Sequence, residues 1–440
     1  MPRFEKLAVG HLAAGLLLSG CLAGTQPATK QQFNPAERPG VQAGAQATGA
    51  LAMRGASESA LIADLLKRQS VLPPDGPFTM VAEEVIKAGS GASVAELRVA
   101  RLKEQARARN WLPRLGPSVN LTSLSGLATS LLLEQALFDN GRRKAERAYA
   151  AADVELAAIS LSAELNERVF QGLSYYVRAE QARAQAAVAV RAVDRLAEFD
   201  LIITERLKGG LSDRSEQQVI RQRLSEMQAT LAGDRETETS AHAELAALAG
   251  RPLEGVRGLD AVLTAAEGPA PLAVLRARAE GGQMVAQANI ERSEMLPGLR
   301  ASTSLAGGGL EPGLRLGGGM INNGLRASMD ALRATGDVAG RRTARVAEDA
   351  RRHIVMLDRQ IALLRSREVE GAAVLQQTAQ NLSLFTEQYK IGRRSLLELV
   401  NQYDTHARLD RDQAALRHEV ALLQLQIARD RGQLVDGARM

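Results

Sequence analysis

Apolar residues recur at helical spacing along most of this chain of 440 residues, in long stretches that contain no proline. Near the C-terminus, five small apolar residues recur at strict heptad spacing: Val400, Ala407, Ala414, Ala421 and Ala428. Three leucines recur at the same spacing on nearly the opposite side of that helix: Leu409, Leu416 and Leu423. A two-helix coiled coil needs only one apolar seam, so two opposed seams predict a neighbouring helix on each flank. A thick bundle with the alanine seam as ordinary core is the alternative.

The apolar spacing changes from helical to alternating at two places. Apolar and polar residues alternate over residues 118–123 and again over 300–305, as they do in half-exposed β-strands. A second apolar run follows each of these segments. We therefore expect four β-strands, at residues 116–124, 130–138, 299–306 and 314–321. Three consecutive glycines, at 317–319, disfavour the last of them.

The length of these strands suits a membrane. A tilted strand of roughly 9 to 11 residues crosses a bilayer, and each expected strand is close to that length. Four strands are too few to close a barrel, and open sheet edges are not tolerated in lipid. Strands inside a membrane would therefore have to share one barrel with other copies of the chain. A soluble four-stranded sheet is the alternative.

Two similar segments, around Gly210 and Gly392, each separate two long helical stretches. Glycine readily adopts the left-handed conformation that ends a helix. Each glycine precedes a capping-box pattern, with an N-cap residue three positions before a glutamate: Asp213 with Glu216, and Ser395 with Glu398. Each segment therefore predicts a tight turn between two antiparallel helices.

The same order of expected elements occurs in both halves of the chain. A helix, two strands and a long helical hairpin make a first repeat at residues 61–250 and a second at 251–436, with the hairpins at 142–249 and 325–436. From Gly141 to Gly210 is 69 residues, and from Gly324 to Gly392 is 68, so we expect outgoing helices of matched length. The predicted fold class is mainly α with a small β part, built by duplication of one unit of strands and helical hairpin.

The composition argues against several classes of function. Aromatic residues are only 3% of the chain, which favours long helices with narrow seams over a compact core of large rings. The net charge is +5, with both signs interleaved along the helices, so we expect no nucleic-acid partner. The five histidines show no metal-binding spacing, and no nucleophile–base pair can be assigned. We expect no catalytic residues, no metal and no cofactor.

The only cysteine, Cys21, follows a short apolar run that has Arg3 and Lys6 ahead of it. This pattern is typical of a secretory signal peptide, here residues 1–20, that ends in a lipobox. Cys21 is expected to carry a lipid that anchors the mature chain in the outer membrane, and residues 21–60 to be a flexible tether. An uncleaved transmembrane anchor is the alternative, although the run is shorter than the roughly 20 residues that a spanning helix needs.

Several short motifs occur in the same order in both halves, behind the lipobox. They are Leu112–Leu115 and Leu296–Leu299 at the strand entries, Leu137–Arg143 at the strand exit, and Tyr389–Val400 at the second helical turn. Because of these motifs and their order, residues 80–436 resemble the outer membrane efflux protein family, the TolC-like channel proteins.

The resemblance implies a homotrimer with a twelve-stranded β-barrel in the outer membrane and an α-helical barrel in the periplasm. It also implies a periplasmic adaptor, or membrane fusion protein, and an inner-membrane RND or ABC transporter as partners. The chain would be the passive export duct of a tripartite efflux or type I secretion system, and it would do no chemistry. The alternative is a periplasmic coiled-coil adaptor or structural protein, which would carry one helical hairpin flanked by small β domains.

The resemblance also assigns roles to residues at the two turns. A latch that closes the tunnel falls on Tyr389 and Arg394, with Ser215 and Glu216 as acceptors. A ring at the tunnel entrance falls on Glu398 and Asn401. The turn residues are expected to dock on the adaptor: Gly209, Gly210, Leu211, Ser212, Gly392 and Arg393. The alternative for Glu216 and Glu398 is that they only cap helices.

Overall fold

A computed structural model describes residues 59–123, 126–253, 255–262, 268–306, 309–317 and 324–439. All of them belong to one compact unit, Ala43–Met440. The expected signal peptide, Cys21 and the tether as far as residue 58 lie outside the described residues. Among the described helices, none is both long enough and apolar enough to cross a membrane.

The predicted order of elements is present in both halves of the described chain. Three helices precede the first strands: α2 (Ala60–Leu66), α3 (Pro77–Lys87) and α4 (Ala92–Ala108). Next come β1 (Arg114–Ser123), β2 (Gly126–Phe138), α5 (Arg142–Lys208) and α6 (Arg214–Ala249). The second half has α7 (Leu272–Glu294), β3 (Gly298–Ala306), β4 (Gly309–Gly317), α8 (Leu325–Lys390) and α9 (Leu396–Asp430), with a 3₁₀ turn at Gly437–Arg439.

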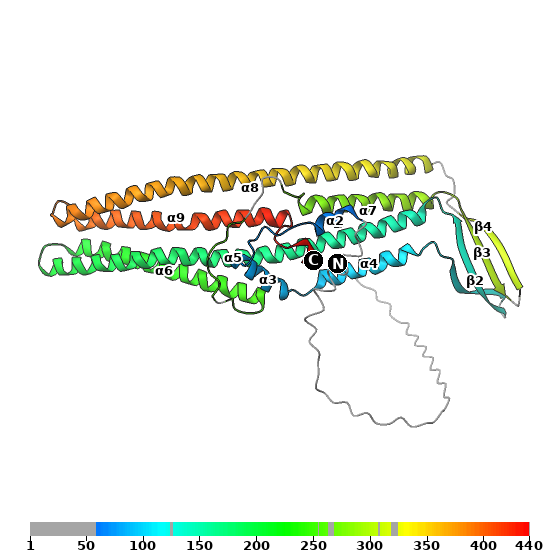
Figure 1. The fold of residues 1–440 in the computed structure, drawn as a ribbon, viewed down its shortest axis with the longest axis horizontal. Helices are drawn as coiled ribbons and strands as arrows, with labels where there is room; N and C mark the ends of the chain where they lie inside the picture. The colour runs from blue at the N-terminus through cyan, green and yellow to red at the C-terminus, as the bar shows by residue number, and fades with distance from the viewer. Residues whose placement is uncertain are drawn as a thin grey trace, which may run out of the picture. The chain divides into compact units, whose positions relative to one another are not determined.

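The outgoing helices have matched lengths, as the glycine spacing predicts. Helix α5 has 67 residues and α8 has 66, so each is about 100 Å long at 1.5 Å per residue. The return helices α6 and α9 have 36 and 35 residues. Figure 1 shows the strands where α5 and α8 begin and the two hairpin turns at the opposite ends of these helices.

The two turns have the same backbone hydrogen bonds. Gly210 and Gly392 have φ angles of 69° and 75°, in the left-handed region that glycine adopts without strain. The amide of the residue after each glycine donates to a carbonyl five residues back: Leu211 to Arg206 at 2.8 Å, and Arg393 to Gln388 at 2.9 Å. This is the Schellman ending of a helix, and it confirms the predicted turns.

The four strands form one antiparallel sheet in the order β1-β2-β3-β4. The prediction that the last strand begins at residue 314 is wrong, because β4 begins at Gly309 and ends at Gly317. Residues 318–321 of that prediction lie outside the described residues. Glycine and proline disfavour strands, so the sequence of residues 309–313 did not predict a strand there. The hairpin with β3, in which Gly309 is opposite Ala306, overrides this preference. Strand β2 likewise begins at Gly126, four residues earlier than expected.

Helix α9 has a neighbouring helix on each flank, as its two apolar seams predict. It contacts α5 on one side and α8 on the other. Of the alanine seam, Val400 and Ala407 belong to a core cluster shared with Ala189 and Phe199 of α5. Of the leucine seam, Leu423 packs with Leu357 of α8.

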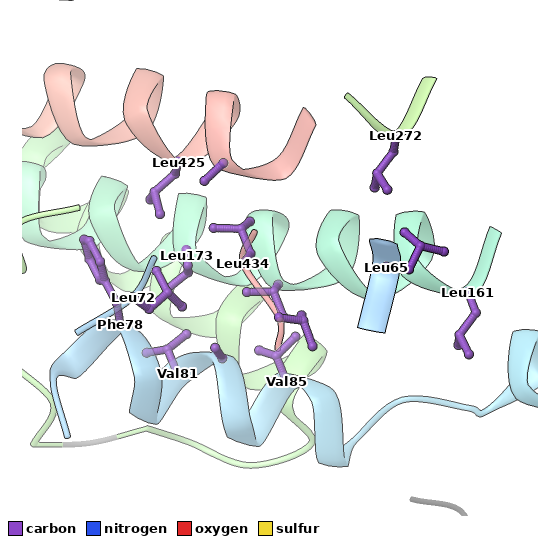
Figure 2. Close-up of a cluster of buried hydrophobic side chains, with 14 of the residues drawn as sticks. Leu65, Leu72, Phe78, Val81, Val85, Leu161, Leu173, Leu272, Leu425 and Leu434 are labelled. Atoms are coloured by element: carbon purple, nitrogen blue, oxygen red, sulfur yellow. The ribbon is translucent and has the colours of Figure 1, made fainter. Parts of the chain in front are cut away.

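The largest core cluster surrounds the first half of α5 and was not predicted from the sequence. Helices α2 and α3 contribute to it, and Phe78 meets Tyr176 of α5 edge to face, with ring centroids 6.0 Å apart. The C-terminal segment lies in the same core, where Asn166 accepts a hydrogen bond from the Leu434 amide at 2.8 Å. Figure 2 shows Phe78, Leu173, Leu425 and Leu434 converging on this cluster. The core therefore joins both repeats near the middle of the long helices.

Candidate functional site

The residues expected to dock on an adaptor lie together at the two hairpin turns. Gly209, Gly210, Gly392 and Arg393 are exposed, and Ser212 is half-buried. Each turn also presents a large aliphatic side chain to solvent. Leu211 is 71% exposed and Ile391 is 65% exposed, although Ile391 was not singled out from the sequence. An exposed aliphatic residue beside a glycine gives each turn a small apolar projection.

Tyr389, one of the two expected latch donors, contacts the other hairpin of the same chain. Its phenolic oxygen accepts a hydrogen bond of 3.5 Å from Nη1 of Arg206, and the Arg206 guanidinium carbon lies 6.0 Å from the centre of its ring. Arg206 is on the last turn of α5. The two hairpins are therefore linked at their ends by a contact that sequence reasoning missed.

Arg394, the second expected donor, makes its polar contacts within its own hairpin. Its Nε donates to Gln388 at 3.0 Å and its Nη1 donates to Glu398 at 3.1 Å. The guanidinium also lies over the ring of Phe385, with the carbon 4.6 Å from the ring centre. The pKa of Glu398 is lowered, first by the hydrogen bond from the backbone of Ser395 and then by the one from Arg394.

The expected acceptors are bonded inside the first turn. Glu216 accepts a hydrogen bond from the Ser212 hydroxyl at 2.8 Å, and the Ser215 hydroxyl donates to Asp213 at 2.6 Å. The pKa of Asp213 is lowered, most by the hydrogen bond from the Ser215 hydroxyl and next by the one from the Glu216 amide. Within the described part of one chain, Tyr389 and Arg394 do not bond to Ser215 or Glu216.

The capping roles of the turn carboxylates are present. Ser395 and Glu398 form the complete capping box, in which the Ser395 amide donates to Glu398 at 3.0 Å and the Glu398 amide donates to the Ser395 hydroxyl at 3.2 Å. Asp213 accepts from the Glu216 amide at 2.9 Å. Asn401 is exposed one turn after Glu398 on α9, so both expected members of the entrance ring lie on one helix face.

The sheet has one apolar face. Successive residues of a strand point to opposite faces, and the register aligns Leu115 with Leu133 and Leu133 with Thr303. On the same face, Leu314 and Leu316 are opposite Ala301 and Leu299. The side chains of Leu314 and Leu316 are 70% and 81% exposed in the single chain. A sheet with such an apolar face needs a partner or a lipid environment to cover it.

The other face of the sheet carries charge at the end where the helices attach. Arg114 is opposite Glu134, and Arg300 is opposite Arg315. These residues line a hollow of about 760 Å³ together with the beginning of α5 and the end of α7. Sequence reasoning missed this charged group, because it depends on the register of the strands.

The described residues contain no group of three or more His, Cys, Asp or Glu side chains that could hold a metal ion.

The fold is similar to solved structures of outer-membrane channels. The outer membrane protein VceC from Vibrio cholerae is 15% identical, with a TM-score of 0.69 over 81% of this chain and 96% of VceC. The CmeC outer membrane channel of Campylobacter jejuni is 13% identical, with a TM-score of 0.68 over 81% of this chain and 86% of CmeC. The MtrE outer membrane channel of Neisseria gonorrhoeae, in its open state, is 15% identical, with a TM-score of 0.65 over 84% of this chain and 93% of MtrE.

No protein-family model matches the chain, and no curated protein matches it. The structural comparisons show that the chain has the fold of these outer-membrane proteins.

Proposed function

We propose that the chain is one subunit of an outer-membrane export channel, the passive duct of a tripartite efflux or type I secretion system. The observation that carries this proposal is the sheet, which has an apolar face, a polar face and two unpaired edges, at the end of two matched helical hairpins. The fold shared with solved outer-membrane channels supports the same conclusion.

The edges of the sheet favour a homotrimer. Among the residues that the structure describes, strands β1 and β4 each pair on one side only, and lipid does not tolerate unpaired strand edges. If β4 of one copy pairs with β1 of the next, three copies supply twelve strands and close a barrel. The apolar face, with Leu115 and Leu133, would then contact lipid, and the polar face would line the lumen.

Helix α8 supports an assembly of the helical part as well. It buries only Ala339, Leu357 and Ile361 along its length, whereas α5 buries residues from Ala145 to Ile203. Several large apolar side chains of α8 are exposed in the single chain: Val338, Val355, Met356, Leu363, Val369, Val374 and Leu384. Neighbouring copies that cover this helix would complete a barrel of helices around a tunnel.

The hairpin turns then lie at the periplasmic end of the tunnel. Leu211 and Ile391, both exposed, offer apolar projections for a periplasmic adaptor. The latch would be formed between copies, by Tyr389 and Arg394 of one copy with Ser215 and Glu216 of the next. An inner-membrane RND or ABC transporter would supply the energy, and a lipid on Cys21 would add an anchor in the outer membrane. A coiled-coil adaptor fits less well, because the chain has two hairpins and not one.

The proposal is tested by fractionation followed by conductance. Protein extracted from purified outer membranes should form discrete single channels when it is added to planar lipid bilayers. A matched sample of the soluble periplasmic fraction should contain little of the protein and show no channels. A chain found mainly in the soluble fraction, or one that forms no channels after extraction from the outer membrane, would contradict the proposal.

A further inference from the structure

Three arginines and one glutamate occupy neighbouring rows on the polar face of the sheet. In the first row Arg114 of β1 is opposite Glu134 of β2. In the next row Arg300 of β3 is opposite Arg315 of β4. Both rows lie at the end of the sheet where the helices attach, because β1 and β3 begin there and β2 and β4 end there. The sheet therefore has a net charge of +2 in these two rows.

The opposed arginines are unfavourable for the sheet itself. Like charges directly opposite each other on neighbouring strands destabilise a sheet. Arg300 relieves part of this repulsion through an ion pair of 3.1 Å with Glu134. Arg315 is exposed and makes no ion pair with any residue that the structure describes, and the same holds for Arg114. The stability of the sheet does not explain these two charges.

The carboxylates of the adjoining hollow are already paired with other arginines. Glu146 lies 3.0 Å from Arg142, whose other nitrogen lies 3.1 Å from Glu294. Asp139 lies 3.6 Å from Arg143. Since Glu134 pairs with Arg300, each of the four carboxylates that line the hollow is paired with an arginine, and Glu146 and Glu294 share Arg142. Two guanidinium groups, those of Arg114 and Arg315, are left over.

We propose that Arg114 and Arg315, with Arg300 between them, form a cationic ring at the periplasmic end of the barrel lumen, which favours anionic solutes. This inference rests on the proposed function. In the trimer, Arg315 at the free edge of one copy would approach Arg114 of the next copy, so that the two rows would continue around the barrel. A ring of fixed positive charge in a narrow lumen concentrates anions. The solutes that fit are those with carboxylate, phosphate or sulfate groups, which guanidinium groups bind well.

The test compares the wild-type channel with two double variants in planar bilayers. The variant R114Q/R315Q removes the two unpaired charges. The control R114K/R315K keeps both positive charges but replaces each guanidinium group with an ammonium group. Reversal potentials are measured across a KCl gradient near 0.1 M, where the screening length is about 10 Å. Block by inorganic tripolyphosphate, added to the extracellular side, is a second measurement.

The wild type and the lysine control should prefer chloride over potassium and be blocked by tripolyphosphate. In R114Q/R315Q the reversal potential should shift toward the equilibrium potential of potassium, and the block by tripolyphosphate should be lost. If all three proteins form channels with equal reversal potentials and equal block by tripolyphosphate, the inference is overturned. A wild type that prefers potassium and resists tripolyphosphate would overturn it as well, even if R114Q/R315Q did not fold. Absence of channels from the wild-type protein would instead contradict the proposed function itself.

Discussion

Arg206 and Tyr389 join the ends of the two helical hairpins within one chain. The guanidinium carbon of Arg206 lies 6.0 Å from the ring centre of Tyr389, and Nη1 donates to the phenolic oxygen at 3.5 Å. Arg206 is exposed and Tyr389 is half-buried. The contact is therefore weak, and it can break and form again when the ends of the hairpins move. The same tyrosine is expected to take part in the latch between copies.

The latch leads to the first prediction. The variant R394S/Y389F should raise the single-channel conductance, because it removes the donors that hold neighbouring hairpins together at the closed end. A contact between exposed charged groups is worth roughly 0 to 1 kcal/mol, so the loss of a few such contacts per trimer is enough to shift the balance toward the open state.

A matched control is R393S, which removes the neighbouring exposed charge in the same turn without touching the latch. Its conductance should remain that of the wild type. If R394S/Y389F also conducts like the wild type, the assignment of Tyr389 and Arg394 to a latch is wrong.

The second prediction concerns the two faces of the sheet. Leu132 and Leu133 are adjacent in β2 and point to opposite faces, with Leu133 beside Leu115 on the apolar face. An arginine on the lipid face of a barrel costs about 2 to 4 kcal/mol at the middle of the bilayer and about 0 to 1 kcal/mol near its surfaces. L133R should therefore lower the yield of heat-stable trimers from outer membranes more than L132R does. Equal yields of the two variants would argue that the Leu133 face does not contact lipid.

The third prediction concerns the turn glycines. G392A places a side chain on a residue with φ of 75°, and the left-handed conformation costs about 1 to 2 kcal/mol for a residue other than glycine. The protein should unfold at a lower temperature in a thermal melt. G233A is the control, since Gly233 lies inside α6 and an added Cβ would have no atom within 4 Å outside its own turns of the helix backbone. There, alanine should stabilise the helix by up to about 1 kcal/mol. If G392A unfolds at the same temperature as the wild type or at a higher one, the left-handed Schellman ending at Gly392 is wrong.

The fourth prediction concerns pH. His418 of α9 is 1% exposed, and burial is the main cause that lowers its pKa below 6.5. Arg417 lowers it further, whereas the hydrogen bond to the Ala414 carbonyl and the charge of Glu180 act in the opposite direction. Below pH 6.5 the unfolded chain binds a proton at His418 that the folded chain does not, so stability falls as the pH falls.

Melting temperatures between pH 8 and pH 5 measure this effect. The acid-induced loss should be smaller in H418Q than in the wild type. It should persist in H353Q, which removes a histidine that is 42% exposed. The same loss in H418Q as in the wild type would show that other groups cause the pH dependence.

Features set by nearby residues were predictable from the sequence. The turn at Gly392 and the capping box of Ser395 and Glu398 are local, and the heptads of α9 follow from a repeated spacing. The core around Phe78 was missed, because α3 is short and its burial depends on Tyr176, far along the chain. Three other features could not be predicted from the sequence for the same reason: the start of β4, the contact of Arg206 with Tyr389, and the arginine rows of the sheet. Each depends on the pairing of distant segments.

Three copies of the chain together are expected to make one hollow conduit. A density map of the protein, extracted from outer membranes in detergent, would show this assembly. We expect threefold symmetry, with twelve strands closed inside the detergent belt and the paired hairpin turns at the far end of a helical tunnel. A single folded chain, with residues 114–138 and 298–317 outside the detergent, would contradict it.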